Sequence, residues 1–314
     1  MSDLEALAAE AYVYGFPMVF NLNEVDRFTR EGMGSLQASP FNGFSHAIGL
    51  AGPKDTFVSV NNDTVYSIAQ IDLSGGPLML RVPDTDGRYY VLQFVDAWTN
   101  NFAYVGRRAT GTAAGSYLLT GAGWSGEVPA GVTRIAAPTA VATIVGRWAC
   151  DGPGDLAAVQ ALQQGTTLEP LDPATSPPAG LPAPQDGVDG SELLFFEKLR
   201  TWMRAFPPSA PDRAYQERFA PLGLLDETTP YAAASTETTQ ALTSGHRLGK
   251  ERVEYATTHS GSPEQNGWKL TYHAFDYNLD FFETGALNTP PVGDRGQGRR
   301  PHRACRLRPR WTVG

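Results

Sequence analysis

Side chains alternate with a period of two along residues 56–148, and this pattern constrains the fold more than any other feature of the chain. In "TVYSIAQIDL", alternate residues point to opposite faces of a strand. Gly75-Gly76 and Asp86-Gly87 separate such runs, because these pairs accept the positive φ of tight hairpin turns. About seven short strands at regular spacing indicate an antiparallel β-sandwich. One predicted face holds Val65, Ser67, Ala69, Ile71 and Leu73, and the other holds Thr64, Tyr66, Ile68, Gln70 and Asp72.

Helical periodicity lies on both sides of the predicted sandwich. Residues 3–20 carry an apolar stripe with Ser2 or Asp3 as cap, and Pro17 is expected to end the regular helix. Residues 191–206 repeat the helical pattern, with Ser191 as cap. The fold class is therefore α+β. The predicted parts are an N-terminal helix with an irregular lead-in (1–50), a β-sandwich (51–150), a linker with one weak helix (151–190), a helical domain (191–290) and an Arg-rich tail (291–314).

Composition restricts the class of protein. Of the 314 residues, 41% are hydrophobic and 18% are charged, which suits a globular chain with a sizeable core. A net charge of −8 argues against a nucleic-acid partner, which needs clustered Lys and Arg. No window reaches the ~18 apolar residues of a membrane span, and no secretory signal opens the chain, so as written it is expected to be cytoplasmic. Cys150 and Cys305 match no metal spacing.

The C-terminal tail departs from this composition. Between residues 293 and 314 a single acid, Asp294, stands against arginines at positions 295, 299, 300, 303, 306, 308 and 310. One interpretation is a basic arm for nucleic acid or an anionic membrane. The other is an aberrant or disordered end that results from a frameshift or truncation, because GC-rich DNA read out of frame yields Arg, Pro, Gly and Ala. The tail has no lysine and little aromatic interleaving, which favours the second interpretation.

Several stretches in fixed order carry a family resemblance: "EAYVYGFPMVFN", "NNDTVYS", "VPDTDGRYYVLQFVDAWTNNFAYVGRRATGTAAGSYLL" and "GRWACDGPGDLAAVQALQQ". Over about residues 8–170 the chain resembles a bacterial family catalogued as domain of unknown function 1254. The resemblance implies an immunoglobulin-like sandwich followed by a helical domain, to which residues 191–260 are similar. It also implies a C-terminal jelly roll, domain of unknown function 1214, whose place after about Pro290 is taken here by the tail. Many relatives carry export signals, so the family is compatible with a periplasmic or exported location. It implies no agreed reaction.

Asn61, Asn62 and Asp63 precede the first long strand. Their oxygens could bind a ligand hydroxyl or a hard metal ion. Alternatively, short polar side chains at a strand entry accept hydrogen bonds from nearby backbone amides, and local physics favours this second interpretation. Tyr66, a few residues further on, either lines a cleft or covers the sheet.

A denser polar and aromatic cluster follows, formed by Asp96, Trp98, Asn100, Asn101, Tyr104 and Arg107. Aromatic rings beside amides and a guanidinium suit the recognition of a sugar or a carboxylate. The alternative is a hairpin whose asparagines shape the turn and whose rings pack on the core. The two interpretations have equal support, and this cluster is the first choice for a binding surface.

Other chemical motifs are weak or missing. His273, Asp276 and Asp280 share a helical spacing but match no established metal motif, so surface polar residues are the better interpretation. No nucleophile elbow, zinc-protease helix, phosphate loop or dinucleotide fingerprint occurs, and no metal or cofactor is expected.

Two functional hypotheses follow from the sequence. The first is a protein that binds a small polar or glycan-like ligand in a cleft between sandwich and helical domain, with Asn61, Asn62, Tyr66, Trp98, Asn100, Tyr104 and Arg107 as candidate contacts. The second is a hydrolase or lyase on a similar substrate, with Asp63 or Asp96 as acid/base and Arg107 holding an anion. A purely structural role and a homo-oligomer are also compatible with the sequence.

Overall fold

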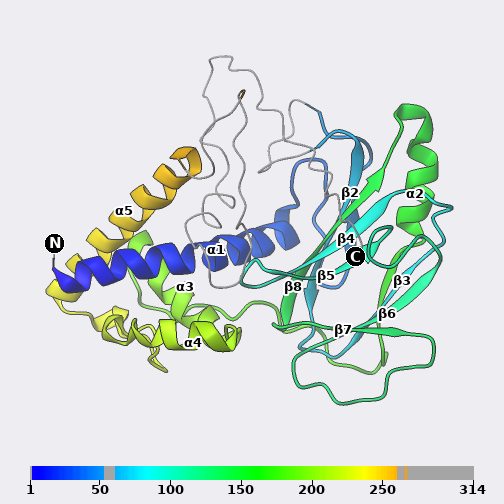
Figure 1. Ribbon diagram of the computed structural model, residues 1–314. Coiled ribbons are helices and arrows are strands. Elements are labelled where there is room, and N and C mark those ends of the chain that lie inside the picture. Colours follow the sequence, from blue (N-terminus) through cyan, green and yellow to red (C-terminus); the bar gives the residue numbers. More distant parts are fainter. Residues whose placement is uncertain (1, 53–60, 260–265, 267–314) are drawn as a thin grey trace, which may run out of the picture.

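The computed structural model describes residues 2–52, 61–259 and 266. Within these residues, strands form two packed sheets on one side and helices gather on the other (Figure 1). The large sheet has the order β1-β2-β8-β4-β5, and the small sheet has the order β7-β6-β3-β9. The strands are β1 (Phe44–His46), β2 (Thr64–Asp72), β3 (Leu78–Val82), β4 (Tyr90–Asp96), β5 (Asn101–Gly106), β6 (Gly115–Thr120), β7 (Thr133–Ala136), β8 (Val141–Ala149) and β9 (Thr167–Pro170).

The two faces of the large sheet separate as the alternation predicts. Val65, Ala69 and Ile71 lie in the core between the sheets, where Tyr90 stacks on Trp148 with ring centroids 5.0 Å apart. Residues of the opposite register form what we call the outer face, which points away from the small sheet. The α+β class with a two-sheet sandwich is therefore confirmed.

The sheets differ in two ways from a simple antiparallel sandwich built from residues 51–150. β1 and β9 lie outside this range, and each extends one of the sheets. β6 and β7 pair in parallel, because the connecting residues 121–132 cross over before the next strand begins. A connection of about a dozen residues is what a parallel neighbour requires. The predicted antiparallel sandwich is therefore confirmed, with this one parallel pair as an exception among the described strands.

Helix α1 (Asp3–Glu31) continues through Pro17, so the prediction that the regular helix ends there is wrong. Ser2 and Glu5 form a capping box at its start, as the sequence suggested for the cap. Proline removes one backbone hydrogen bond, but buried apolar side chains continue on the same face beyond it. Leu22, Val25 and Phe28 supply this packing, which outweighs the local helix-breaking preference.

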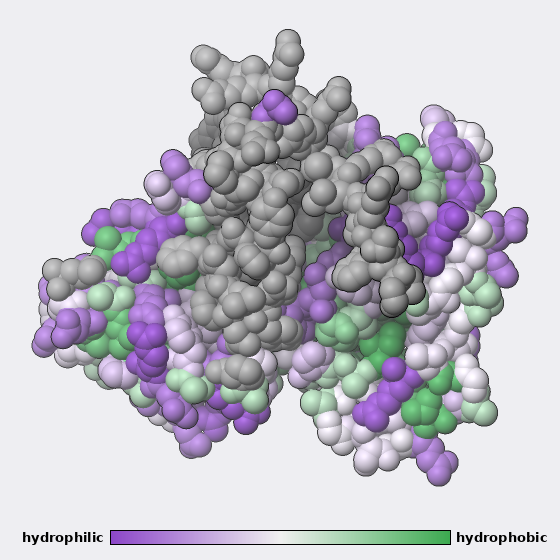
Figure 2. Space-filling model, viewed as in Figure 1, coloured by the Kyte–Doolittle hydropathy of each residue, from purple (hydrophilic) through white to green (hydrophobic). Residues whose placement is uncertain are grey.

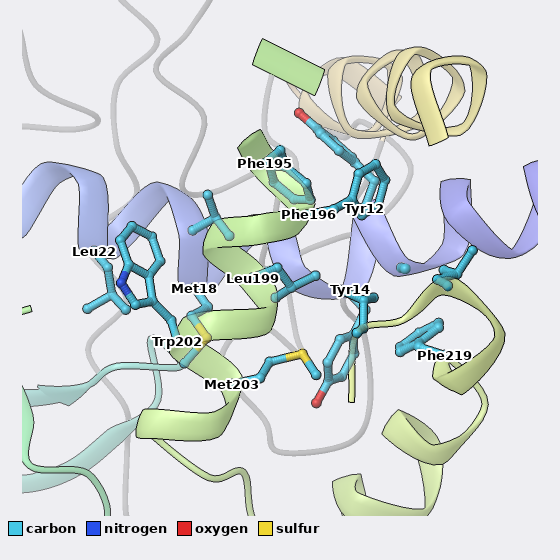
Figure 3. Packing of buried hydrophobic residues seen from close by; sticks show 14 of the residues in the cluster. Tyr12, Tyr14, Met18, Leu22, Phe195, Phe196, Leu199, Trp202, Met203 and Phe219 are labelled. Atoms are coloured by element: carbon cyan, nitrogen blue, oxygen red, sulfur yellow. The ribbon is translucent and has the colours of Figure 1, made fainter. Parts of the chain in front are cut away.

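The other helices complete the fold. α2 (Leu156–Gln164), preceded by the short 3-10 turn η1 (Pro153–Asp155), lies beside the sandwich. α3 (Ser191–Ala205), α4 (Ala210–Glu217) and α5 (Thr236–His259) pack with α1 into what we call the helical layer, with η2 (Ala220–Leu222) and η3 (Tyr231–Ala233) between them. In Figure 3, Tyr12, Met18 and Leu22 of α1 meet Phe195, Leu199 and Trp202 of α3. The arginine-rich tail and the His273, Asp276 and Asp280 group lie outside the described residues.

A buried ion pair lies inside the helical layer. Arg200 donates from Nη2 to Glu197 Oε1 at 2.6 Å and from Nε to Oε2 at 2.9 Å, with both side chains almost fully buried. The remaining polar atoms are also used, since Gln185 N–H donates to Glu197 and Arg200 Nη1 donates to the carbonyl of Asp226. Such complete pairing offsets the cost of burying two charges. The pair therefore ties the segment before α3 and the segment after η2 to one helix.

α1 and α5 approach closely because α5 presents glycines at the contact. A Cβ atom on Gly245 would lie 2.3 Å from the Cβ of Ala8, and one on Gly249 would lie 2.6 Å from the Cβ of Tyr12. Both distances are shorter than a van der Waals contact. We therefore expect Gly245→Leu to separate the two helices and to lower the free energy of unfolding by about 2 kcal/mol or more. Urea denaturation measures this loss, and the exposed Thr243→Ala should show none; equal stability of both variants would contradict the close packing.

His246 on α5 lies in an aromatic environment, edge-on to Tyr12 at 4.7 Å and to Phe195 at 5.5 Å between ring centroids. Burial lowers the pKa of His246, with Glu192 opposing and Lys250 adding to this effect. Below the ordinary histidine pKa of about 6.5, the unfolded chain therefore binds more protons than the folded one. Burial lowers the pKa of His46 in the same direction.

Stability should accordingly fall as the pH decreases below about 6.5, because the buried imidazoles must either stay neutral or leave their sites. His246→Leu should make the decrease shallower, while His46 maintains part of it. Free energies of unfolding measured between neutral and mildly acidic pH check this. An identical pH dependence in wild type and His246→Leu would show that His246 does not contribute.

Candidate functional site

A cavity of about 190 Å³ lies between the C-terminal half of α1 and the outer face of the large sheet. Figure 1 shows this half of the helix beside the strands. Much of the wall is apolar, including Val25, Phe28, Met33, Leu36, Ile68 and Val145. Small residues of the two connecting segments, Gly34, Ala47, Gly49 and Ala51, complete the lining and leave the space unfilled. A mostly apolar cavity with a few polar groups is the usual form of a small-molecule site.

Strand register places the polar groups of the cavity. On the outer face, Tyr66 lies opposite Arg147, and Gln70 lies opposite Thr143. Ile68 and Val145 form the row between them. Arg147 and Thr143 are four residues apart on β8, or about 13 Å between Cα atoms at the usual strand rise. The sheet therefore presents a polar group, an apolar strip and a second polar group in sequence.

Arg147 is half-buried and is held by side chains of neighbouring strands. Its Nη1 donates to Gln93 Oε1 at 2.8 Å, and its guanidinium lies 5.6 Å from the centroid of the Tyr66 ring. Gln93 Nε2 in turn donates to Asn101 Oδ1 at 2.6 Å. The guanidinium makes no ion pair with any residue that the structure describes. The site thus contains a positioned cation without a fixed counter-charge.

Gln70 is 5% exposed and lines the same cavity. Its carbonyl oxygen accepts from the Thr143 hydroxyl at 2.7 Å. Its NH₂ group has no hydrogen-bond partner within the described part of the chain. This donor is therefore available to a molecule in the cavity.

Glu24 is the acidic residue of the lining, and it is already paired. Both of its carboxylate oxygens accept from the guanidinium of Arg27, one turn further along α1. This pair contributes no net charge to the cavity. Asn21 is also engaged, since its Nδ2 donates to the carbonyls of Asp96 and Ala97 at 3.4 Å.

Among the polar residues before β2, Asn61 fixes the backbone at the start of the strand. Asn61 Oδ1 accepts from Thr64 N–H at 3.1 Å and from Thr64 Oγ1 at 2.7 Å, and Asn61 N–H donates to the Tyr66 hydroxyl at 3.0 Å. This arrangement is the backbone-fixing role that local physics favours. Asn62 and Asp63 are exposed at the same turn. Of this group, the structure brings Tyr66 to the cavity.

Asp96, Trp98 and Asn100 form the turn between β4 and β5. Asp96, 1% exposed, accepts from Trp98 N–H at 2.9 Å and from Asn100 N–H at 2.8 Å through one carboxylate oxygen. Thr99 takes a positive φ of 70°, which is unusual for a β-branched residue. Trp98 Nε1 donates to the carbonyl of Phe206 at 2.8 Å and its ring packs near Tyr14. These residues therefore shape the turn and attach it to the helical layer.

Tyr104 and Arg107 lie on the exposed side of this hairpin. Tyr104 is 47% exposed; partial burial raises the pKa of its hydroxyl, while the charge of Arg147 opposes this. The exposed guanidinium of Arg107 makes no hydrogen bond or ion pair with any described residue. Neither residue lines the cavity. The six-residue cluster predicted from the sequence is therefore divided between a turn, an open surface and, through Asn101, the support of Arg147.

Sequence reasoning missed Arg147, Gln70, Thr143 and Asn21 as site residues. One signal was present for Arg147, because an arginine inside the apolar strand "AVATIVGRW" must either reach solvent or serve a site. Gln70 was placed on the correct face but had no signal of its own. Asn21 belongs to the part of α1 that the sequence did not assign to a helix.

Ser67 and His46 form a second polar arrangement, inside the sandwich. Ser67 Oγ accepts from Trp148 Nε1 at 3.0 Å and from Gln163 Nε2 at 3.1 Å, so its own hydrogen is directed to His46 Nδ1 at 2.7 Å. The pair resembles a serine nucleophile with its base. Ser67 is fully buried, however, so the arrangement fixes β1 and α2 to β2 rather than meeting a substrate.

The described residues contain no cluster of three or more His, Cys, Asp or Glu side chains able to hold a metal ion. None of the helices found among them is long and apolar enough to span a membrane.

The turn geometry gives a test of Asp96. Asp96→Ala removes the acceptor for two partly buried backbone N–H groups and should lower the free energy of unfolding by about 1–3 kcal/mol. Asp96→Asn keeps an oxygen acceptor and should cost less. Urea denaturation checks both, with the exposed Asp189→Ala as control, for which no loss is expected. If Asp96→Ala were as stable as the control, Asp96 would not hold the turn and an acid/base role would regain support.

Comparison with known proteins supports the family resemblance over the sandwich. Residues 41–170 match the family model described as "Protein of unknown function (DUF1254)". No curated protein matches the chain. The structure is similar to the VPA0106 protein from Vibrio parahaemolyticus, with a TM-score of 0.63 and 20% identity over 82% of this chain and 61% of that one. An uncharacterized protein from Burkholderia cenocepacia aligns with a TM-score of 0.29 and 10% identity, over 80% of this chain and 52% of that one. The chain thus spans less than two thirds of either protein, and the Vibrio protein shares its fold.

Proposed function

We propose that this protein binds a small molecule in the cavity between α1 and the outer face of the large sheet. The observation that carries the proposal is the combination of an apolar wall with polar groups that have hydrogen-bonding capacity left. The sequence suggested a cleft between the sandwich and the helical domain (191–290), whereas the described lining of this cavity comes from α1, the segment after it and the large sheet. The residues differ, because Tyr66 is the member of the predicted set that lines this cavity.

The local geometry supports binding over catalysis by the residues proposed from the sequence. Asp96 is buried and its carboxylate holds the β4–β5 turn. Asp63 lies at an exposed turn outside the cavity lining. A hydrolase or lyase that uses either carboxylate as acid/base would need a different substrate site.

Blocking the cavity tests the proposal. Val145 lies in the cavity wall at the centre of the outer face, so Val145→Trp should fill the space. A panel of short acids, alcohols and amides is screened by thermal denaturation. At ten times its Kd, a ligand should stabilise the wild type by about 1.4 kcal/mol, and Val145→Trp should lose this response.

Ser116→Trp is the control, because Ser116 lies on the small sheet opposite the exposed Arg81 and outside the cavity lining. It should keep the ligand response. Loss of the response in both variants, or in neither, would contradict binding in this cavity.

A further inference from the structure

The cavity carries one uncompensated positive charge. Glu24 is neutralised by Arg27, and Arg147 makes no ion pair with the described residues. Guanidinium groups remain protonated at all relevant pH values. The local field therefore favours a ligand with a negative charge over a neutral or cationic one.

The guanidinium is also oriented before any ligand arrives. The chain of contacts from Asn101 through Gln93 fixes one Nη1 hydrogen, and the Tyr66 ring covers one side of the group. An arginine has five N–H donors in a rigid plane. Those that remain can pair with the two oxygens of a carboxylate, a geometry that a single hydroxyl cannot reproduce.

A second donor lies at the other end of the apolar strip. The NH₂ group of Gln70 belongs to a side chain that is 5% exposed, and it has no partner in the described chain. Between Gln70 and Arg147 lie only Ile68 and Val145 on the two strands. Because Arg147 and Gln70 both donate hydrogen bonds, a molecule that fits the cavity accepts a hydrogen bond at each end and is apolar in between.

We infer that the ligand is a carboxylic acid with an apolar body, whose carboxylate pairs with Arg147 and whose far end offers an oxygen to Gln70. This inference rests on the proposed function and assigns the chemical class of its ligand. The apolar body lies along Ile68 and Val145. Gln93 is a positioning residue, because it acts on the ligand through Arg147.

Octanoate, octanol and octylamine have the same alkyl chain but differ in the charge of the head group. They therefore separate the contribution of charge to affinity from that of apolar burial. Calorimetric titration of the full chain should give a Kd for octanoate about tenfold to a hundredfold lower than that for octanol, with octylamine weakest. Equal affinity of octanoate and octanol would overturn the carboxylate while leaving the cavity as a binding site. Failure of every probe to bind would contradict the proposed function itself.

Arg147→Met removes the charge but keeps a long apolar side chain. It should weaken octanoate about tenfold to a hundredfold and leave octanol unchanged. Arg107→Gln, at the exposed arginine of the neighbouring hairpin, should leave both affinities unchanged. If instead Arg107→Gln abolished octanoate binding, the anion would be held on the hairpin, as the sequence first suggested. Circular dichroism and thermal midpoints confirm that each variant is folded.

The second end is tested with ω-hydroxyoctanoate. The added hydroxyl should improve affinity over octanoate in the wild type by about threefold to tenfold, and Gln70→Met should remove this gain while retaining octanoate binding. A gain that persists in Gln70→Met would show that another group receives the far end of the molecule.

Discussion

The continuity of α1 is the constraint on which the rest of the structure depends. A helix of 29 residues is about 43 Å long, which allows one element to serve two packing surfaces. Its first half is held by α3 and α5, with Gly245 and Gly249 permitting close approach. Its second half lies over the outer face of the large sheet. If the helix ended at Pro17, this face would lose its cover and the cavity would not exist.

The β4–β5 turn determines how closely the helix and the sheet can meet. Asp96 holds the turn, Asn21 of α1 donates to its carbonyls, and Trp98 reaches Phe206 of the helical layer. These contacts fix the middle of α1 against the sheet, whereas the small residues near positions 34 and 47–51 leave space beside the C-terminal part of the helix. In Figure 2, hydrophilic residues are spread over the visible surface of both the helical layer and the sandwich.

The sequence predicts the sandwich well because alternation is a local property. The two faces of β2 hold the residues that the alternation predicts, because burial of one face determines the register in which β2 pairs with β8. The continuation of α1 beyond Pro17 and the strand β9 were not predicted, because each depends on a partner that is distant in the sequence. The partner of α1 is the rest of the helical layer, and the partner of β9 is β3. The same limit applies to the site. The cluster around Asp96 has the composition of a binding site, but its carboxylate accepts hydrogen bonds from the backbone of its own turn. Arg147 and Gln70 lie far apart in the sequence, and the pairing of β8 with β2 brings them to the same face of the sheet.

The energetics of Arg147 explain why such a residue indicates a site rather than a defect. A half-buried guanidinium that has no counter-ion among the described residues gives up hydration that Gln93 and the Tyr66 ring only partly replace. An apolar residue at this position would pack against Val145 and Ile68 without that loss. The NH₂ group of Gln70, whose side chain lines the same cavity, is a second donor without a partner among the described residues. Two donors with unmet hydrogen bonds facing one cavity are consistent with a fold that gives up stability in order to bind, and an anionic acceptor between them would recover it.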